Sequence, residues 1–440
     1  MLLSPNMQEW LPENHLARFI VGAVEQFDLR HVEDSYEGRG YRAYRPKMLL
    51  ALLIYGYAVG TFSSRKIERA TVDSIAFRYI AANTSPDHDT IADFRRRVLP
   101  ELPKIFLQLL LLAKELGFLK VGQVSIDGTK IKANASKHHA LSHGHIGRIQ
   151  AHLRREIKRL MRLSEQADNE KTDDGLDIPA EIARRETMLD KLSVAKAKIE
   201  EREAARHAEV RAKHAQRLAA RKEMRERTGK KPPGKPPKTP KLRIEPTAQI
   251  NLTDEESRIM PSADGFMQGF NAQAAVDVSS MLVLAPLVTQ ATNDKEQVSP
   301  ALTALAALPA AGVGAVSDLL ADAGYFSAGN VAACEAAQIV PLISMQRDPH
   351  HGWLAKTLLK TGKPAETASL TERMRIRLQT KDGRALYAKR KSTVEPVFGI
   401  IKSAMQFRAF SLRGLERVSG EWSLVCTAFN FKRLASLIVI

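Results

Sequence analysis

One short stretch decides how this chain folds: residues 121–128 read VGQVSIDG. Its apolar residues are typical of a buried β-strand, which is predicted to end at Asp127 and the turn residue Gly128. Upstream of this stretch the sequence has a helical pattern. We therefore expect a sheet to begin here, with an acidic side chain at the end of its first strand.

Alternating strand and helix patterns follow this stretch. Residues 270–278 and 281–289 are predicted to form two strands joined at Ser279 and Ser280, which suggests a hairpin. Helices are expected again after about Ser392, and the alternation as a whole is typical of a mixed α/β sheet. In between, we expect a helix at 299–310, a strand at 317–321, a helix at 327–337 and a strand at 338–344.

Residues 1–118 are predicted to form helices. The run at 48–59 is apolar nearly throughout, and a helix that is apolar all round is buried. Two further helices are expected at 89–98 and 102–116, with prolines as breakers before each. This region should therefore form a small helical bundle.

Three arginines stand at the end of the helix expected at 89–98. They are Arg95, Arg96 and Arg97. Such a cluster could contact DNA phosphates, or it could merely favour the negative end of the helix dipole. The sequence leaves both interpretations open.

A basic helical insertion interrupts the α/β region. Apolar residues recur in it at three- and four-residue steps, which predicts a coiled-coil-like helical hairpin, followed by a Pro/Lys-rich linker that should be extended and flexible. The insertion could serve self-association, DNA contact or both. The predicted domains are a helical DNA-binding domain at 1–118, a catalytic core at 119–137 and 247–440, the insertion at 138–228 and the linker at 229–246.

Composition narrows the class of protein. Among 440 residues, 66 are Lys or Arg and 49 are Asp or Glu, which gives a formal net charge of +17. That excess favours a nucleic-acid partner, although a generic basic soluble protein also has it. Two cysteines fit a reducing cytoplasm, and the most apolar run, residues 105–113, is far shorter than the roughly 20 residues of a membrane helix. We expect a cytoplasmic protein with no membrane contact.

Two kinds of site are not expected. The sequence has no Gly-rich phosphate loop of the Walker type, so nucleotide hydrolysis is not predicted. Four histidines cluster between His138 and His145, but no cysteine lies near them to complete a usual zinc site.

Three acids stand where a metal ion could reach them. Asp127 and Asp322 each close a predicted strand, at the sheet edge where α/β folds build their sites. Glu395 lies in a first helical turn, where the following Pro396 costs little. Taken singly, a strand-terminal Asp is more often a turn or capping residue. Together, three carboxylates on strand, strand and helix provide the hard oxygen ligands that two Mg²⁺ ions need for phosphoryl transfer.

Six short stretches carry a resemblance to a known family. They are YRPKMLL at 44–50, PDHDTIADFR at 86–95, IDGTK at 126–130, NLTDEESRIM at 251–260, GFNAQ at 269–273 and ADAGY at 321–325. With these, the chain resembles the bacterial insertion-sequence transposases, which carry a DDE catalytic triad on a ribonuclease-H-like fold. The resemblance runs nearly from end to end.

The third acid lies in a stretch similar to that family's Tyr-Arg-Glu-Lys signature. The corresponding residues are Tyr387, Arg390, Glu395 and Lys402. The family's register places the arginine four positions before the glutamate, where Lys391 stands, so the sequence leaves open which of Arg390 and Lys391 takes that role. Glu395 and Lys402 are two helical turns apart and should share one face, about 10 Å from each other. The resemblance implies that Lys402 grips a DNA phosphate; without it, a solvated helix residue would be expected.

The resemblance implies a transposase that cuts at the ends of its mobile element and joins the freed 3′-hydroxyls to target DNA. The implied cofactor is a pair of Mg²⁺ ions, with Mn²⁺ as a substitute, held by Asp127, Asp322 and Glu395. The implied partners are double-stranded DNA, both terminal inverted repeats and target, and further copies of the chain in a dimer or larger assembly. Bacterial cytoplasm, at the nucleoid, is the implied location. A ribonuclease-H-like nuclease without strand transfer and a non-catalytic transposase-derived repressor are the alternatives.

Overall fold

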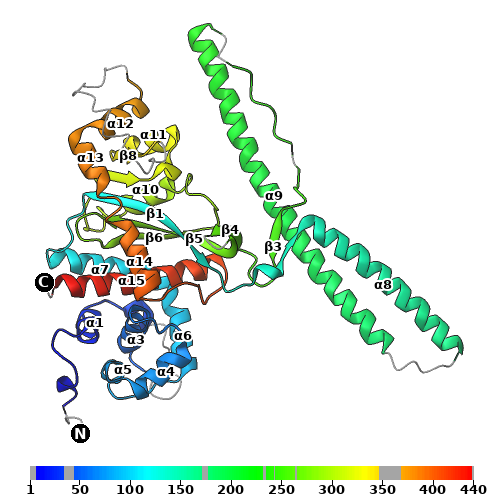
Figure 1. Cartoon of the computed structure of the whole chain (residues 1–440), viewed down its shortest axis with the longest axis horizontal. Coiled ribbons are helices and arrows are strands. Elements are labelled where there is room, and N and C mark those ends of the chain that lie inside the picture. The colour runs from blue at the N-terminus through cyan, green and yellow to red at the C-terminus, as the bar shows by residue number, and fades with distance from the viewer. Residues whose placement is uncertain are drawn as a thin grey trace. The chain divides into compact units, whose positions relative to one another are not determined.

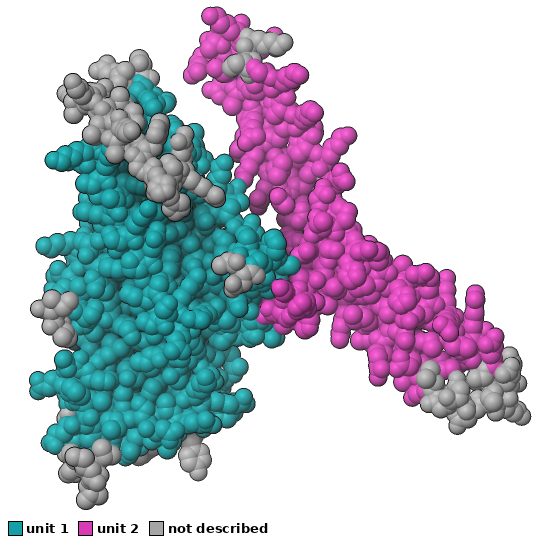
Figure 2. Space-filling model, viewed as in Figure 1, with its two compact units in different colours: residues 1–134, 259–440 teal, residues 135–258 magenta. Residues whose placement is uncertain are grey.

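The computed structural model divides the chain into two compact units. Unit 1 comprises residues 1–134 and 259–440, and unit 2 comprises residues 135–258 (Figure 2). The structure describes residues 6–33, 44–170, 177–230, 234–241, 243–262, 265–345 and 368–438. No helix in these described ranges is long and apolar enough to cross a membrane.

Unit 1 is built on a mixed six-stranded sheet (Figure 1). Its strand order is β4-β5-β1-β7-β8, and β6 pairs with β5 off this path. β1 pairs antiparallel with β5 and parallel with β7, so both kinds of pairing meet at the strand that carries Asp127. The predicted mixed α/β class is confirmed. The strands are β1 (Gln123–Lys132), β4 (Arg258–Ser262), β5 (Gly265–Asp277), β6 (Val283–Thr289), β7 (Asp318–Ala321) and β8 (Val340–Ile343).

β1 is longer than its sequence predicts. It continues past Asp127 to Lys132, because β5 pairs with it as far as Lys132 opposite Gly269. The parallel ladder with β7, in contrast, stops at Ser125 opposite Leu320. Asp127 therefore lies inside β1, yet just beyond the last β1–β7 pair, where the β7 side of the strand opens.

Helices after the predicted hairpin follow the expected order. α10 (Val298–Ala306) contacts β6, and α11 (Ala328–Ala336) contacts β8. α12 (Leu370–Gln379) and α13 (Lys381–Ala388) were not predicted. They are short and rich in charged residues, so no long apolar stripe marks them.

The last helix, α15 (Leu415–Ile438), joins the sheet to the N-terminal helices. It contacts β6, α3 and α7 (Figure 1). The buried Asn430 side chain bonds both backbone groups of Val283 on β6, each at 2.8 Å. Trp422 donates from its indole nitrogen to the Gln273 carbonyl on β5 at 2.9 Å. These side chains fix α15 to the sheet.

The N-terminal helices agree with the predicted bundle. Every residue of α3 (Pro46–Ala58) from Leu49 to Ala58 is buried, as its all-apolar sequence requires. The remaining helices of this region are α1 (Leu16–Glu25), α2 (Arg30–Glu33), α4 (Ser64–Asp73), α5 (Ile75–Ile80), α6 (His88–Val98) and α7 (Leu102–Glu115).

Unit 2 contains the predicted helical hairpin. α8 (His143–Glu170) contacts α9 (Ile178–Thr228), and both pack on a small core that includes Ile146, Leu192 and Ile199. A two-stranded sheet of β2 (Ala140–Ser142) and β3 (Gln249–Asn251), which the sequence did not predict, closes the base of this unit. α9 ends at Gly229, whose φ of 64° suits glycine.

The linker after α9 is extended, as expected, but it is not detached. Side chains of α9 bond its backbone at three places: Arg221 to Gly234, His214 to Pro237 and His207 to Pro240. Because proline has no backbone N–H, the Pro-rich linker has few amide donors of its own. Side chains of α9 donate to its carbonyl groups instead. The described residues 234–241 are thus extended and bonded to α9, and the flexibility of the linker stays a prediction.

Candidate active site

Asp127 lies in β1 with its carboxylate largely buried. Its Oδ1 accepts a hydrogen bond from the Gly128 amide at 2.7 Å. Burial raises the pKa of this carboxyl group to about 6, and the nearby charge of Asp322 acts in the same direction. The two aspartates are thus close enough to repel each other.

Asp322 follows β7 directly. It caps a short turn, Ala323–Tyr325, by accepting from the Gly324 amide at 2.8 Å. This is the capping geometry that a strand-terminal Asp often adopts. The Asp322 carboxylate is also near enough to Asp127 for its charge to raise the pKa of that acid.

Arg390 connects Asp127 with Glu395. Its guanidinium lies 3.7 Å from Asp127 Oδ2 and 3.4 Å from Glu395 Oε1. The Arg390 residue is only 8% exposed, whereas Glu395, in the first turn of α14 (Val394–Gly399), is half exposed. One guanidinium therefore brings the acid of β1 and the acid of α14 together.

The geometry separates Arg390 from Lys391, the two candidates for the signature arginine. Lys391 is exposed, while Arg390 contacts the acids. α13 ends at Ala388 and α14 begins at Val394, so a turn separates the basic residues from Glu395. A four-residue helical register does not apply across such a turn. Tyr387 lies in the last turn of α13 and is partly exposed.

Lys402 reaches β1 from the other end of α14. It lies in a π-helical turn, Ile400–Ala404, and donates to the Thr129 hydroxyl two residues from Asp127. Half-burial lowers the pKa of its ammonium group. The expected regular helix from Glu395 to Lys402 is therefore wrong, because the π turn intervenes. Such turns insert a residue and recur at functional sites.

A polar network centred on Asp294, a residue that the sequence did not single out, lies near Asp127. Asp294 accepts from Asn271 at 2.7 Å and from Gln273 at 2.6 Å. Gln273 in turn accepts from the hydroxyl of Tyr325, three residues after Asp322. Asn271 and Gln273 alternate on one face of an otherwise apolar strand, which is the signal that could have identified them.

Gly128 makes this arrangement possible. It pairs with Gln273 across the β1–β5 ladder. A Cβ atom on residue 128 would lie 2.0 Å from Gln273 Nε2 and 2.7 Å from Asp294 Oδ1. Only glycine, which has no Cβ atom, allows the side chains of Gln273 and Asp294 to lie this close to β1.

The donor set suits a hard divalent cation, because it consists of carboxylate oxygens. Within the described residues, however, no three His, Cys, Asp or Glu side chains lie together as a metal-holding group. Arg390 instead supplies the positive charge between Asp127 and Glu395.

The three arginines of α6 differ in their contacts. Arg95 donates to the Phe62 carbonyl at 3.1 Å, and Arg96 pairs with Asp93 one turn earlier. Arg96 and Arg97 are exposed, whereas Arg95 is partly buried.

Comparison with known families gives two matches. Residues 5–97 match a family described as Transposase domain (DUF772), and residues 238–431 match one described as Transposase DDE domain. The chain belongs to the insertion-sequence DDE transposases. Asp322, Arg390, Glu395 and Lys402 lie within the second match, whereas Asp127 lies in neither. No curated protein and no solved structure matches the chain.

Membership has direct consequences for this transposase. Enzymes of the DDE family use divalent metal ions, act on DNA and carry out transposition. The match at residues 238–431 begins near the end of unit 2, so the insertion separates β1 from the rest of the DDE domain in sequence. Pairing of β1 with β5 and β7 restores it to that domain in space.

Proposed function

We propose that this transposase cleaves DNA at the ends of its mobile element and joins the freed 3′ ends to target DNA, with Asp127, Asp322 and Glu395 as its catalytic acids. The observation that carries the proposal is the meeting of three separate elements: Arg390 contacts Asp127 and Glu395, and Asp322 acts electrostatically on Asp127. All of these groups lie in unit 1.

The reaction needs two displacements at phosphorus. Water attacks a phosphodiester at the element end, a P–O3′ bond breaks, and a 3′-hydroxyl is released. That hydroxyl then attacks a target phosphodiester, forming a new P–O3′ bond and releasing a 3′-hydroxyl of the target strand. Two Mg²⁺ ions, when held by the three acids, would activate the attacking oxygen and stabilise the leaving one.

Two basic residues would contact DNA phosphates during this reaction. Lys402 lies beside Thr129 on β1, and Arg390 lies between the acids. We infer that Arg390 rather than Lys391 is the arginine of the signature. The single positive charge of Lys402 would attract a neighbouring phosphate. Tyr387 would contact the same DNA strand.

The remaining features belong to the same proposal. Residues 1–118 would recognise the terminal inverted repeats, with Arg95, Arg96 and Arg97 of α6 among the residues that contact DNA. The insertion at 138–228 and the linker at 229–246 would serve assembly of a dimer or larger complex on DNA. The place of action would be the nucleoid in a bacterial cytoplasm.

The test compares single substitutions that keep the side-chain size. Asp127→Asn, Asp322→Asn and Glu395→Gln should each abolish joining of a pre-cut donor end to target DNA in Mg²⁺. Asp318→Asn is the matched control, because Asp318 opens the same strand that Asp322 follows and its side chain bonds to Ser317 rather than to any group of the candidate site. Full joining by any of the three variants would remove that acid from the mechanism.

The same assay separates the alternatives. Cleavage without joined product would indicate a nuclease, and DNA binding without Mg²⁺-dependent cleavage would indicate a repressor. Both outcomes would overturn the proposed strand transfer.

A further inference from the structure

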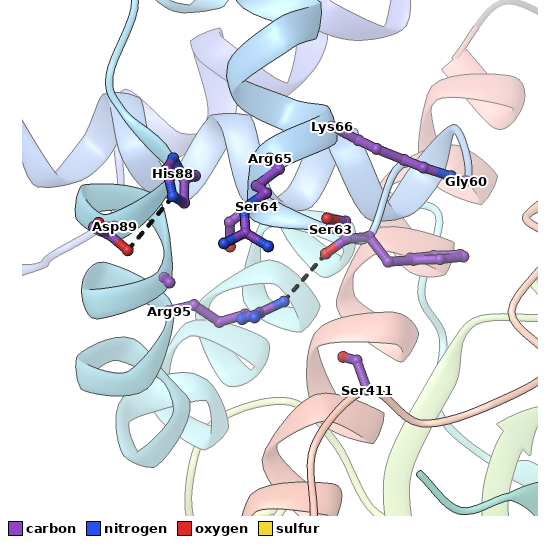
Figure 3. A pocket seen from close by; sticks show the side chains of 11 residues that line it. Gly60, Ser63, Ser64, Arg65, Lys66, His88, Asp89, Arg95 and Ser411 are labelled. Carbon is purple, nitrogen blue, oxygen red and sulfur yellow. Dashed lines mark hydrogen bonds and ion pairs between the residues drawn. The ribbon is translucent and has the colours of Figure 1, made fainter.

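A pocket of about 460 Å³ lies between the N-terminal helices and the loop before α15. Its wall is formed by the start of α4 and the loop before it, by α6 from His88 to Arg95, and by Ser411 (Figure 3). None of its lining residues belongs to the candidate active site described above.

The start of α4 supplies backbone donors to this pocket. The first amide groups of a helix have no intrahelical acceptor and carry the positive end of the helix dipole. Ser63 occupies the N-cap position of α4, but its side chain makes no capping hydrogen bond. The 10-residue helix α4 thus directs uncapped N–H groups toward the space that Ser63, Ser64 and Arg65 line.

The Ser64 hydroxyl is the second observation that points to a ligand. Ser64 is only 8% exposed, and its Oγ has no hydrogen-bond partner among the described residues. Leaving a buried hydroxyl unpaired destabilises the folded state, so native proteins rarely do it without a reason. In Figure 3 this side chain faces the same space as Arg65 and Arg95.

Positive charge prevails in the pocket. Arg65, Lys66 and Arg95 line it, and Arg95 is held in place by its bond to the Phe62 carbonyl at 3.1 Å. Among the described lining residues, the one carboxylate belongs to Asp89, whose side chain is 87% exposed and lies 3.8 Å from His88. The three cationic side chains therefore give the pocket lining a net positive charge.

We propose that this pocket binds one phosphate of the DNA backbone, with the α4 amides and the Ser64 hydroxyl as donors and Arg65 and Lys66 as the paired charges. A phosphodiester has the single negative charge and the two free oxygens that this set of donors can satisfy. The inference rests on the proposed function only in that the ligand is DNA. It adds a specific anchoring point outside the catalytic acids.

The test uses a duplex of arbitrary sequence, because a backbone phosphate is common to every sequence. Binding is measured by fluorescence anisotropy, without metal, over a range of salt concentrations. Ser64→Ala should weaken binding about tenfold with an unchanged salt slope, since it removes a hydrogen bond but no charge. Arg65→Gln should lower the slope by about one. Arg69→Gln, the same charge change on the same helix but outside the pocket, is the control.

Thermal unfolding of the free variants provides the second readout. Ser64→Ala should unfold at the same or a higher temperature than the parent, because its hydroxyl has no partner to lose. Weaker DNA binding by a variant that is no less stable cannot come from misfolding. A lower unfolding temperature together with unchanged DNA affinity would overturn the proposal.

Other outcomes are equally informative. Equal effects of Arg65→Gln and Arg69→Gln would show a diffuse basic surface and overturn the pocket. If Ser64→Ala impaired binding of inorganic phosphate but not of the duplex, the site would serve a free anion, which would overturn the assignment to DNA. If the protein bound DNA and the pocket substitutions had their expected effects, but no strand transfer occurred, only the proposed catalytic function would be rejected.

Discussion

Gly128 is the residue at which the fold and the candidate site constrain each other most tightly. A methyl group there would meet Gln273 at 2.0 Å and Asp294 at 2.7 Å. Gly128→Ala should therefore displace the polar network, lower the unfolding free energy by about 1–3 kcal/mol and reduce strand transfer. Gly122→Ala is the control, because the nearest atom to its added methyl would be 3.8 Å away. Urea unfolding of both variants tests this, and equal stabilities would contradict it.

Asp127 should make the stability of the metal-free protein depend on pH. Its pKa is raised from 3.8 to about 6, so the folded state holds this proton more tightly than the unfolded state does. This raised pKa lowers the free energy of unfolding by almost nothing below about pH 3, and by about 3 kcal/mol once the pH has risen past 6. Asp127→Asn should thus be more stable than the parent at about pH 8 and equally stable at about pH 3. Unfolding with a chelator present measures the difference, and a gap that does not change with pH would refute its origin in Asp127.

Arg390 and Lys391 offer a direct comparison of neighbouring cations. Arg390→Gln removes the positive charge between Asp127 and Glu395 and should lower the joining rate about 100-fold. Lys391→Gln removes an equal charge from an exposed position. It should change the rate less than about threefold, because exposed charges have small interaction energies in water. Rates of strand transfer with saturating DNA provide the measurement. The reverse ranking would assign the signature role to Lys391.

How much of the site the sequence predicts depends on the kind of residue. Asp127 and Asp322 end apolar runs, a local pattern that is enough to predict a sheet edge. Asn271, Gln273 and Asp294 meet only through the β1–β5 pairing and the loop after β6, and Arg390 reaches its acids across a turn. Local spacing marks Asn271 and Gln273 as alternating polar positions in an apolar strand, but it does not predict that they meet Asp294, or that Arg390 meets the acids.

Among the elements, predictability follows apolar content. β6, β7 and β8 lie close to their predicted positions because their sequences are almost wholly apolar. β5 begins earlier than predicted, at Gly265, because polar residues interrupt its apolar pattern. β4 and the two strands of unit 2 are short or polar, and their sequences do not predict them. The π turn at Ile400–Ala404, from which Lys402 bonds Thr129 of β1, is not predicted by the sequence either.

The attachment of α15 to β6 yields a prediction for these elements. Asn430→Ala would remove both hydrogen bonds to Val283 and leave its buried N–H and C=O unpaired. The unfolding free energy should fall by about 2–4 kcal/mol, from two unpaired groups at about 1–2 kcal/mol each. Ser436→Ala, at an exposed position of the same helix, should change it by less than about 0.5 kcal/mol. Urea titrations of both variants decide this, and similar midpoints would mean that α15 docks by apolar contact alone.

For the whole molecule, the insertion explains why a long sequence interval separates the first acid from the other two. The chain leaves unit 1 after Asn134 and returns at Ile259. β1 is held to unit 1 by β5 and β7, so the site does not need unit 2 for its geometry. Each unit also has buried apolar residues of its own.

Because each unit has its own buried core, we expect the two units to unfold in separate transitions. Leu192 is fully buried in the core of unit 2, and Leu434 is fully buried in α15 of unit 1. Leu192→Ala and Leu434→Ala each remove the same atoms and should each cost about 2–5 kcal/mol. Calorimetry should show two transitions, with Leu192→Ala lowering one and Leu434→Ala the other. A single transition lowered by both would show that the units fold together, and Glu395 and Asp127 would then depend on the insertion after all.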